Sequence, residues 1–217
     1  MSAGLFVTGT GTEVGKSVVS AVIARGAAAA GQRVRVFKPA VSGLDEGGES
    51  DQALLRRASG SDQAEEEIAP YRFGPPLSPH LAAELAGVEI DPARVLAAAA
   101  AARADAELFV CEGVGGLLVP LTPDWLVRDL AGELELPLVV VAPPALGTIN
   151  HTLLTLEAAR AAGLEVRAVV LSRWPAAPGE LERSNRETIA ALGEVDVLTL
   201  GEIDLAQPDC WPSLPLP

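Results

Sequence analysis

Cysteine is scarce in this chain, and so are aromatic side chains, positive charge and long apolar runs. Only Cys111 and Cys210 occur among the 217 residues, too few for a disulfide framework or a Cys-x-x-Cys metal site, so we expect a reducing compartment. The net charge of −13 disfavours binding to nucleic acid or to an anionic membrane surface. The apolar runs are shorter than a membrane span and no basic-then-apolar leader is visible, which predicts a cytoplasmic protein without a membrane anchor.

The length and the pattern of apolar residues predict one α/β domain over 1–217. Short β-branched runs alternate with Ala-, Leu-, Glu- and Arg-rich segments of helical length, which is typical of βαβ units on a parallel sheet. The expected strands are 5–8, 34–37, 107–112, 136–142, 166–172 and 195–200. The expected helices are 16–30, 92–103, 147–162 and 179–192. Ligands of such folds bind at the carboxyl ends of the strands.

A glycine-rich segment, GTGTEVGKS at 9–17, follows the first expected strand and opens the first helix. Backbone N–H groups of such a loop can surround a phosphate at a helix N-terminus. Lys16 would then reach the terminal phosphates, and Ser17 would offer its hydroxyl to Mg²⁺. Five residues separate Gly9 from Gly15, whereas the usual phosphate loop has four between its glycines. A tight turn before a surface helix is the alternative interpretation.

Two lysines and two carboxylates are further candidates for a site. Of the sixteen basic side chains only Lys16 and Lys38 are lysines, which indicates that both stand where a compact ammonium group is needed. Lys38 ends the second expected strand, Glu112 ends the third, and Asp51 begins a helix. Mg²⁺ usually takes one or two carboxylates, so Glu112 and Asp51 are candidate metal ligands. The structural alternatives are a solvated lysine, an N-cap or a surface salt bridge at Glu112, and an N-cap at Asp51.

Two other segments have less specific patterns. The segment 71–87 combines aromatic residues and prolines before a short helix, and its His80 lacks the partners of a hydrolase triad, so no triad is expected. The residues 147–151 open another helix, whose free N–H groups could accept a carboxylate. An ordinary helix start explains this second pattern equally well.

Taken together, these segments resemble the dethiobiotin synthetase family. The resemblance covers nearly the whole chain and rests on VTGTGTEVGKS, KPAVSG, SDQALL, PYRF…PLSPH, CEGVGG, LGTINHTLLT and LGEI. The lengthened phosphate loop is a trait of that family. The resemblance implies a P-loop NTPase-like α/β fold, with about seven parallel strands flanked by helices, and a homodimer. It also implies that ATP, Mg²⁺ and CO₂ or bicarbonate are used to convert 7,8-diaminononanoate to dethiobiotin, through a carbamate and a carbamic–phosphoric anhydride, with release of ADP and phosphate.

The resemblance further assigns roles to residues at matching positions. The residues acting on the carbamate and the γ-phosphate would be Lys38, Lys16 and Thr12. The Mg²⁺ ligands would be Ser17, Asp51 and Glu112. The nucleotide-binding positions would be Gly11, Thr12, Glu13, Val14, Gly15, Lys16, Ser17, Val18, Asp51, Glu112, Gly113, Val114, Gly115, Ser172, Arg173, Ile203, Asp204 and Leu205. The substrate-binding positions would be Ser42, Pro79, Gly147, Thr148, Ile149 and Asn150.

Two positions depart from the family pattern. Many members have an asparagine that recognises the adenine edge after the strand VRAVVL, whereas this chain has Ser172-Arg173. Many members have proline after LGEI, whereas this chain has Asp204. We therefore hypothesise a looser preference for ATP over other nucleoside triphosphates.

Two other classes of P-loop protein are weaker alternatives. A related amidoligase would need an ammonia source, usually a glutaminase domain, for which 217 residues are too few. A nucleotide-switch ATPase acting on a protein partner is the second alternative. Partitioning ATPases of that kind carry a lysine five residues before the invariant one, and Gly11 stands at that position here.

Overall fold

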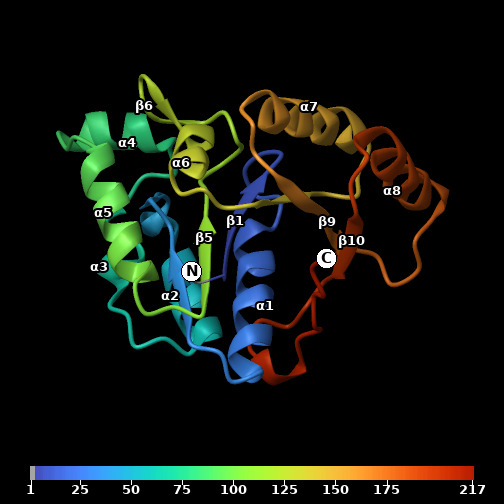
Figure 1. The fold of residues 1–217 in the computed structure, drawn as a ribbon, viewed down its shortest axis with the longest axis horizontal. Coiled ribbons are helices and arrows are strands. Elements are labelled where there is room, and N and C mark those ends of the chain that lie inside the picture. The colour runs from blue at the N-terminus through green and yellow to red at the C-terminus, as the bar shows by residue number, and fades with distance from the viewer. Residues whose placement is uncertain (1–2) are drawn as a thin grey trace.

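One twisted parallel sheet with helices on both faces forms the body of the protein (Figure 1). The computed structural model describes residues 3–217. The strands of the sheet are β1 (Ala3–Gly9), β2 (Val34–Phe37), β5 (Leu108–Glu112), β8 (Leu138–Ala142), β9 (Val166–Trp174) and β10 (Val197–Gly201). Their order is β10-β9-β8-β1-β5-β2, and every pairing is parallel. The α/β class and all six expected strands are confirmed, but in the described residues this sheet has six strands and not the seven that the resemblance implied.

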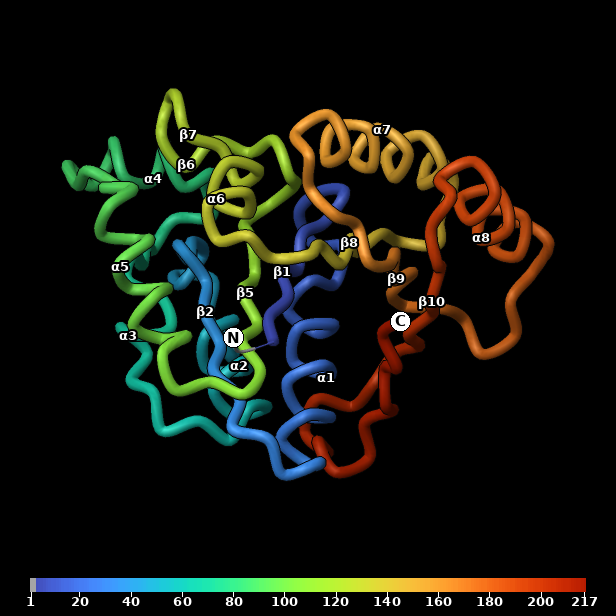
Figure 2. Tube along the Cα trace, in the orientation of Figure 1, coloured from blue at the N-terminus to red at the C-terminus, as the bar shows by residue number. Residues whose placement is uncertain are grey.

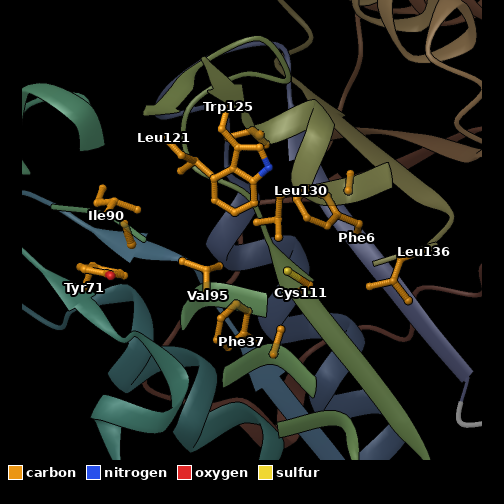
Figure 3. Close-up of a cluster of buried hydrophobic side chains, with 14 of the residues drawn as sticks. Phe6, Phe37, Tyr71, Ile90, Val95, Cys111, Leu121, Trp125, Leu130 and Leu136 are labelled. Atoms are coloured by element: carbon orange, nitrogen blue, oxygen red, sulfur yellow. The ribbon is translucent and has the colours of Figure 1, made fainter. Parts of the chain in front are cut away.

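Alternate residues of the strands pack on opposite faces of the sheet, as the pleat of a strand requires. Val7 of β1 belongs to a buried cluster with Val22 of helix α1 (Lys16–Ala29). Its neighbour Phe6 belongs to a different cluster with Cys111 and Leu130, and Figure 3 shows these side chains close to Trp125. Because both faces are covered, the strands appear in the sequence as nearly continuous apolar runs.

The expected helices form close to the predicted bounds, as α1, α5 (Pro92–Arg103), α7 (Thr148–Ala161) and α8 (Glu180–Gly193). The start of α5 follows from its sequence, since Asp91 accepts a hydrogen bond from the N–H of Ala93 and proline occupies the first helical position. The helix expected to begin at Asp51 is α2 (Asp51–Ser59), and the short helix after the proline-rich segment is α4 (Pro79–Ala86).

Several short elements lie outside the sequence predictions. They are β3 (Ala40–Val41) and β4 (Tyr71–Arg72), which pair in parallel, the hairpin of β6 (Pro120–Thr122) and β7 (Trp125–Leu126), the helices α3 (Glu65–Ile68) and α6 (Val127–Glu133), and the 3₁₀ turns η1 (Leu44–Glu46) and η2 (Pro208–Cys210). Each is two to seven residues long, too short to show a periodic apolar pattern.

The last segment of the chain returns along α1. Figure 2 traces it in red from β10 past the lower end of that helix. Leu205 and Trp211 pack against Ala21, Leu54 and Ala58 of α1 and α2, and Arg25 of α1 forms an ion pair with Asp209. None of the helices in the described part of the chain is both long and apolar enough to cross a membrane.

Candidate active site

The phosphate loop folds tightly between the end of β1 and the start of α1. Glu13 and Gly15 both have left-handed backbone angles, with φ of 59° and 92°. A Cβ atom on Gly9 would come within 2.7 Å of Cγ2 of Val14, so a larger residue at position 9 would push the loop apart. The glycine-rich turn after β5 lies against the loop, since a Cβ on Gly115 would be 3.6 Å from Oγ1 of Thr12. The strand, loop and helix expected from the sequence are therefore present.

Lys16 is folded back onto its own loop. Its Nζ donates a hydrogen bond to the carbonyl oxygen of Gly11 at 2.8 Å, and the residue is 7% exposed. Burial lowers the pKa of Lys16 to about 8, although the carboxylate of Glu112 acts in the opposite direction. The ammonium group is therefore poorly solvated, and an anion arriving in the loop would be a better partner than a single carbonyl.

Lys38 and the two candidate metal ligands form one ionic cluster. Nζ of Lys38 lies 2.5 Å from Oδ2 of Asp51 and 2.6 Å from Oε1 of Glu112, and Ser17 donates from Oγ to the same Oε1 at 2.9 Å. Lys38 is 4% exposed and Glu112 is fully buried. These four residues are far apart in the sequence. They meet here because the end of β2, the end of β5 and the starts of α1 and α2 lie next to one another.

This geometry decides between the interpretations left open by the sequence. The solvated alternative for Lys38 is wrong, because the ammonium group is buried between two carboxylates. The N-cap alternative for Asp51 is also wrong, since Ser50 occupies the N-cap position of α2 and the Asp51 side chain contacts Lys38. Glu112 does form an ion pair, but a buried one rather than one on the surface.

The pKa shifts of Lys38 and Asp51 favour the charged forms of these two side chains. Burial alone would lower the pKa of Lys38, but the carboxylates of Glu112 and Asp51 outweigh burial and raise it. Burial opposes the ionisation of Asp51, yet the Lys38 ammonium and the Ser17 hydroxyl lower its pKa. With its pKa raised by these carboxylates, the Lys38 ammonium group is suited to stabilise negative charge rather than to act as a base.

The same cluster has the oxygen donors that a divalent cation needs. Oε2 of Glu112 is buried and has no hydrogen-bond partner among the described residues. Burying a carboxylate oxygen without a partner destabilises the fold, and a bound cation would remove that penalty. The hydroxyl of Ser17 and the carboxylates of Asp51 and Glu112 are oxygen ligands of the type that Mg²⁺ prefers. The residues present therefore fit a magnesium ion.

The expected substrate positions lie on three separate segments of the chain. Ser42 follows β3, Pro79 is the buried first residue of α4, and Gly147 caps the N-terminus of α7 with φ of 92°. Thr148 is 1% exposed, and its Oγ1 has no hydrogen-bond partner in residues 3–217. Gly147 follows β8, so the parallel order of the strands places the start of α7 at the carboxyl edge that carries the phosphate loop, whereas β3 and β4 lie outside that sheet.

The two positions that depart from the family pattern have different surroundings. Ser172 is buried and donates from Oγ to the carbonyl oxygen of Val14 at 2.5 Å, whereas Arg173 is exposed with a left-handed φ of 51°. Asp204 lies elsewhere, in the wall of a hollow beyond the end of β10. The hydrogen bond of Ser172 thus joins β9 to the phosphate loop.

The hollow beyond β10 has a volume of about 290 Å³ and is formed by the C-terminal segment. Ile203 and Asp204 line it together with Trp211. The indole Nε1 of Trp211 donates to the carbonyl oxygen of Asp204 at 2.8 Å. Leu205 faces α1 and α2 instead, and its carbonyl accepts a hydrogen bond from Arg57. The sequence offered little signal for Trp211, because its segment lacks periodicity and is rich in proline.

The fold and this loop define a P-loop nucleotide-binding protein. Comparisons with known proteins narrow that class. A family model described as an AAA domain matches residues 3–208. The chain is 48% identical over 198 residues to the ATP-dependent dethiobiotin synthetase BioD of Anaeromyxobacter sp. (strain K), covering 87% of this chain and 89% of that protein.

Two Bacillus proteins of the same name are also similar. The ATP-dependent dethiobiotin synthetase BioD of Bacillus cereus (strain B4264) is 43% identical over 198 residues, covering 91% of this chain and 82% of its own. That of Bacillus subtilis (strain 168) is 39% identical over 196 residues, covering 90% and 85%. The chain belongs to the dethiobiotin synthetase family.

Proposed function

We propose that this protein is a cytoplasmic, ATP-dependent dethiobiotin synthetase, which joins CO₂ to 7,8-diaminononanoate and closes the ureido ring with release of ADP and phosphate. The observation that carries the proposal is the buried cluster of Lys38, Asp51, Glu112 and Ser17 directly beside a lengthened phosphate loop. A loop for the triphosphate, oxygen donors for a metal and an ammonium group for the reacting anion therefore lie side by side.

The nucleotide would lie along the loop and the start of α1. Backbone N–H groups from Gly11 to Val18 would surround its phosphates, and Lys16 would exchange the Gly11 carbonyl for phosphate oxygens. Ser17, Asp51 and Glu112 would hold Mg²⁺, which supplies neutralising charge to the transferring phosphoryl group. The turn of Gly113, Val114 and Gly115 would border the phosphates from the other side.

The reaction itself needs electrostatic support more than proton transfer by the protein. One substrate amine attacks CO₂ to form a carbamate and releases a proton. A carbamate oxygen then attacks the γ-phosphorus, the bond to ADP breaks, and a carbamic–phosphoric anhydride results. The second amine attacks its carbonyl carbon, and phosphate leaves as the ring closes. Every intermediate is anionic, so the ammonium groups of Lys38 and Lys16, with Thr12 at the loop tip, would act on the carbamate and the γ-phosphate.

The substrate and a second subunit would complete the site. Ser42 and Pro79 would contact the diamine, and the N-terminus of α7, from Gly147 through Thr148, Ile149 and Asn150, would accept its carboxylate. Leu118, Leu146 and Leu154 are large apolar side chains exposed by 53%, 87% and 55%, on the turn after β5 and around α7. Exposed leucines near the site support a homodimer in which this edge is covered.

The base would occupy the hollow beyond β10. Ile203 and Asp204 line that hollow. Arg173 comes just before Trp174, which pairs with Gly201 of the hollow. Leu205 packs against α1 and α2 in the same cluster as Trp211 of the hollow. Because Asp204 stands where many relatives have proline, the contacts to the base differ, and we keep the hypothesis of a looser preference for ATP. Turnover with equal concentrations of ATP, GTP and CTP tests it, and strict dependence on ATP would dispose of it.

The decisive experiment is a coupled assay of ADP release from MgATP with 7,8-diaminononanoate and bicarbonate. We expect release only when both the diamine and bicarbonate are present. A nucleotide-switch ATPase would instead release ADP without the diamine, and that result would refute the proposal. The variant Lys38→Met should lose the diamine-dependent rate, whereas Ser20→Ala, which alters a buried hydroxyl outside the cluster, should retain it.

A further inference from the structure

Ser172 lies directly under the phosphate loop, although β9 is separated from β1 by β8. Its neighbour Leu171 packs into the cluster with Leu156 and Ile189 of α7 and α8. Alternation along the strand therefore turns Ser172 to the opposite face, where α1 begins. The side chain is 2% exposed, and its hydroxyl donates to the carbonyl oxygen of Val14 at 2.5 Å.

That hydrogen bond fixes the orientation of the peptide between Val14 and Gly15. The described chain contains no cis peptide bonds, and in a trans peptide the C=O and the following N–H point in opposite directions. Because the Val14 carbonyl points to β9, the N–H of Gly15 points away from β9. Successive backbone N–H groups of such a loop form a concavity that binds an anion, and we take the Gly15 N–H to be one of the groups that line it.

Packing leaves the loop little freedom to turn this peptide over. The side chain of Val14 is 8% exposed and lies against Gly9. A Cβ atom on Gly15 would come within 2.9 Å of Oγ and 3.0 Å of Cβ of Ser172. The Val14 side chain is thus held by the start of the loop, and the Val14 carbonyl is held by β9.

We propose that Ser172 is a positioning residue for the triphosphate: through Val14 it orients the Gly15 N–H, and it supports nucleotide binding independently of the base. The inference rests on the proposed function, in which a nucleoside triphosphate is a substrate. The hydroxyl has one hydrogen, which it donates to Val14, and the side chain is buried, so this position does not serve as a donor to the base.

The test compares ligands that share the triphosphate and differ in the base. Binding of ATP, GTP and inorganic tripolyphosphate is measured by calorimetry in the presence of Mg²⁺. For Ser172→Ala we expect the affinity for all three ligands to fall by about fivefold to tenfold, as for the loss of one buried hydrogen bond. Ser172→Thr keeps the hydroxyl and should restore most of the affinity. Ser20→Ala is the matched control, because its buried hydroxyl has no partner in the described residues.

A second readout separates positioning from a general loss of structure. In the turnover assay, Ser172→Ala should raise the KM for ATP and leave the KM for the diamine unchanged, while urea unfolding verifies that the variant is folded. If Ser172→Ala does not fold, Ser172→Cys, which keeps the volume but donates only weakly, should show the same uniform loss.

Two outcomes would overturn the inference. A loss for ATP with unchanged tripolyphosphate binding would show that the side chain acts on the base, and equal affinities in Ser172→Ala and the parent protein for all three ligands would show that the hydrogen bond is irrelevant. Failure of the proposed function looks different: the unchanged protein would bind these ligands and yet release no ADP in response to the diamine.

Discussion

Removing the ammonium group of Lys38 should destabilise the metal-free protein more than any loss of a surface ion pair. In Lys38→Met, the carboxylate of Glu112 stays fully buried. It keeps the hydrogen bond from the hydroxyl of Ser17 and the electrostatic attraction of the Lys16 ammonium, but it loses its ion-pair partner. Breaking a buried ion pair by removing one member typically costs about 3–5 kcal/mol. Asp51 adds little to this, because its side chain is 39% exposed and water can screen its charge.

The assay is urea unfolding followed by circular dichroism, in EDTA and again with Mg²⁺. The double variant Lys38→Met/Glu112→Gln removes both charges and should recover most of the loss. Measured together with Glu112→Gln alone, it completes a double-mutant cycle that gives the coupling energy of the pair. Mg²⁺ should stabilise Lys38→Met more than the parent protein, because the metal ion can then neutralise the Glu112 carboxylate that has lost the ammonium group. Arg72→Met, which breaks an exposed pair with Glu66, is the control and should change little.

Two results would refute the reasoning about this cluster. The first is a free energy of unfolding for Lys38→Met within about 1 kcal/mol of the parent value, the range of surface ion pairs. The second is an equal loss in the single and double variants, which would mean that the unpaired charge of Glu112 is not the cause.

Three further predictions concern Lys16 and the thiols. Lys16→Ala should fold normally and lose on the order of a hundredfold to a thousandfold in turnover, as for a lost contact to a developing anion, and near-normal ADP release would contradict its role. In the nucleotide- and metal-free protein the pKa of Lys16 is lowered from 10.5 to about 8; the unfolded chain thus binds more protons between these values, so the free energy of unfolding should rise across that pH window. Lys16→Met should abolish the rise in urea titrations at successive pH values. Burial raises the pKa of the Cys111 thiol, so mass spectrometry after maleimide treatment should find native protein labelled at the exposed Cys210 alone; rapid labelling of Cys111 would contradict the packing of β5.

The parallel sheet and the phosphate loop could be predicted because each depends on local sequence. An apolar run before Gly9 and a helix after Lys16 are visible without any long-range contact. The small elements were not predictable in this way: Trp125 and Leu126 form a strand of two residues whose position depends on Phe6 and Leu130 beneath it. The described sheet has six strands, and the short β3 pairs with β4 outside it.

The meeting of Lys38 and Glu112 depends on strand order, which the sequence does not encode locally. β2 pairs with β5 so that its last residue, Phe37, is opposite Cys111. The next residues along the chain, Lys38 after β2 and Glu112 at the end of β5, therefore come together. The sequence identified both as residues at strand ends but left open a solvated lysine and a surface salt bridge. The contact of Ser172 with Val14 is more remote still, because it requires the order β9-β8-β1.

Both lysines of this chain are buried in the candidate site, at 7% and 4% exposure, and this has a practical consequence for handling the protein. Reagents directed at amines, such as succinimidyl esters used for cross-linking, dye attachment or immobilisation, will find no lysine on its surface. Apart from a free chain terminus, any amine that such a reagent modifies belongs to Lys16 or Lys38, so labelling should inactivate the protein, and saturating nucleotide should protect it.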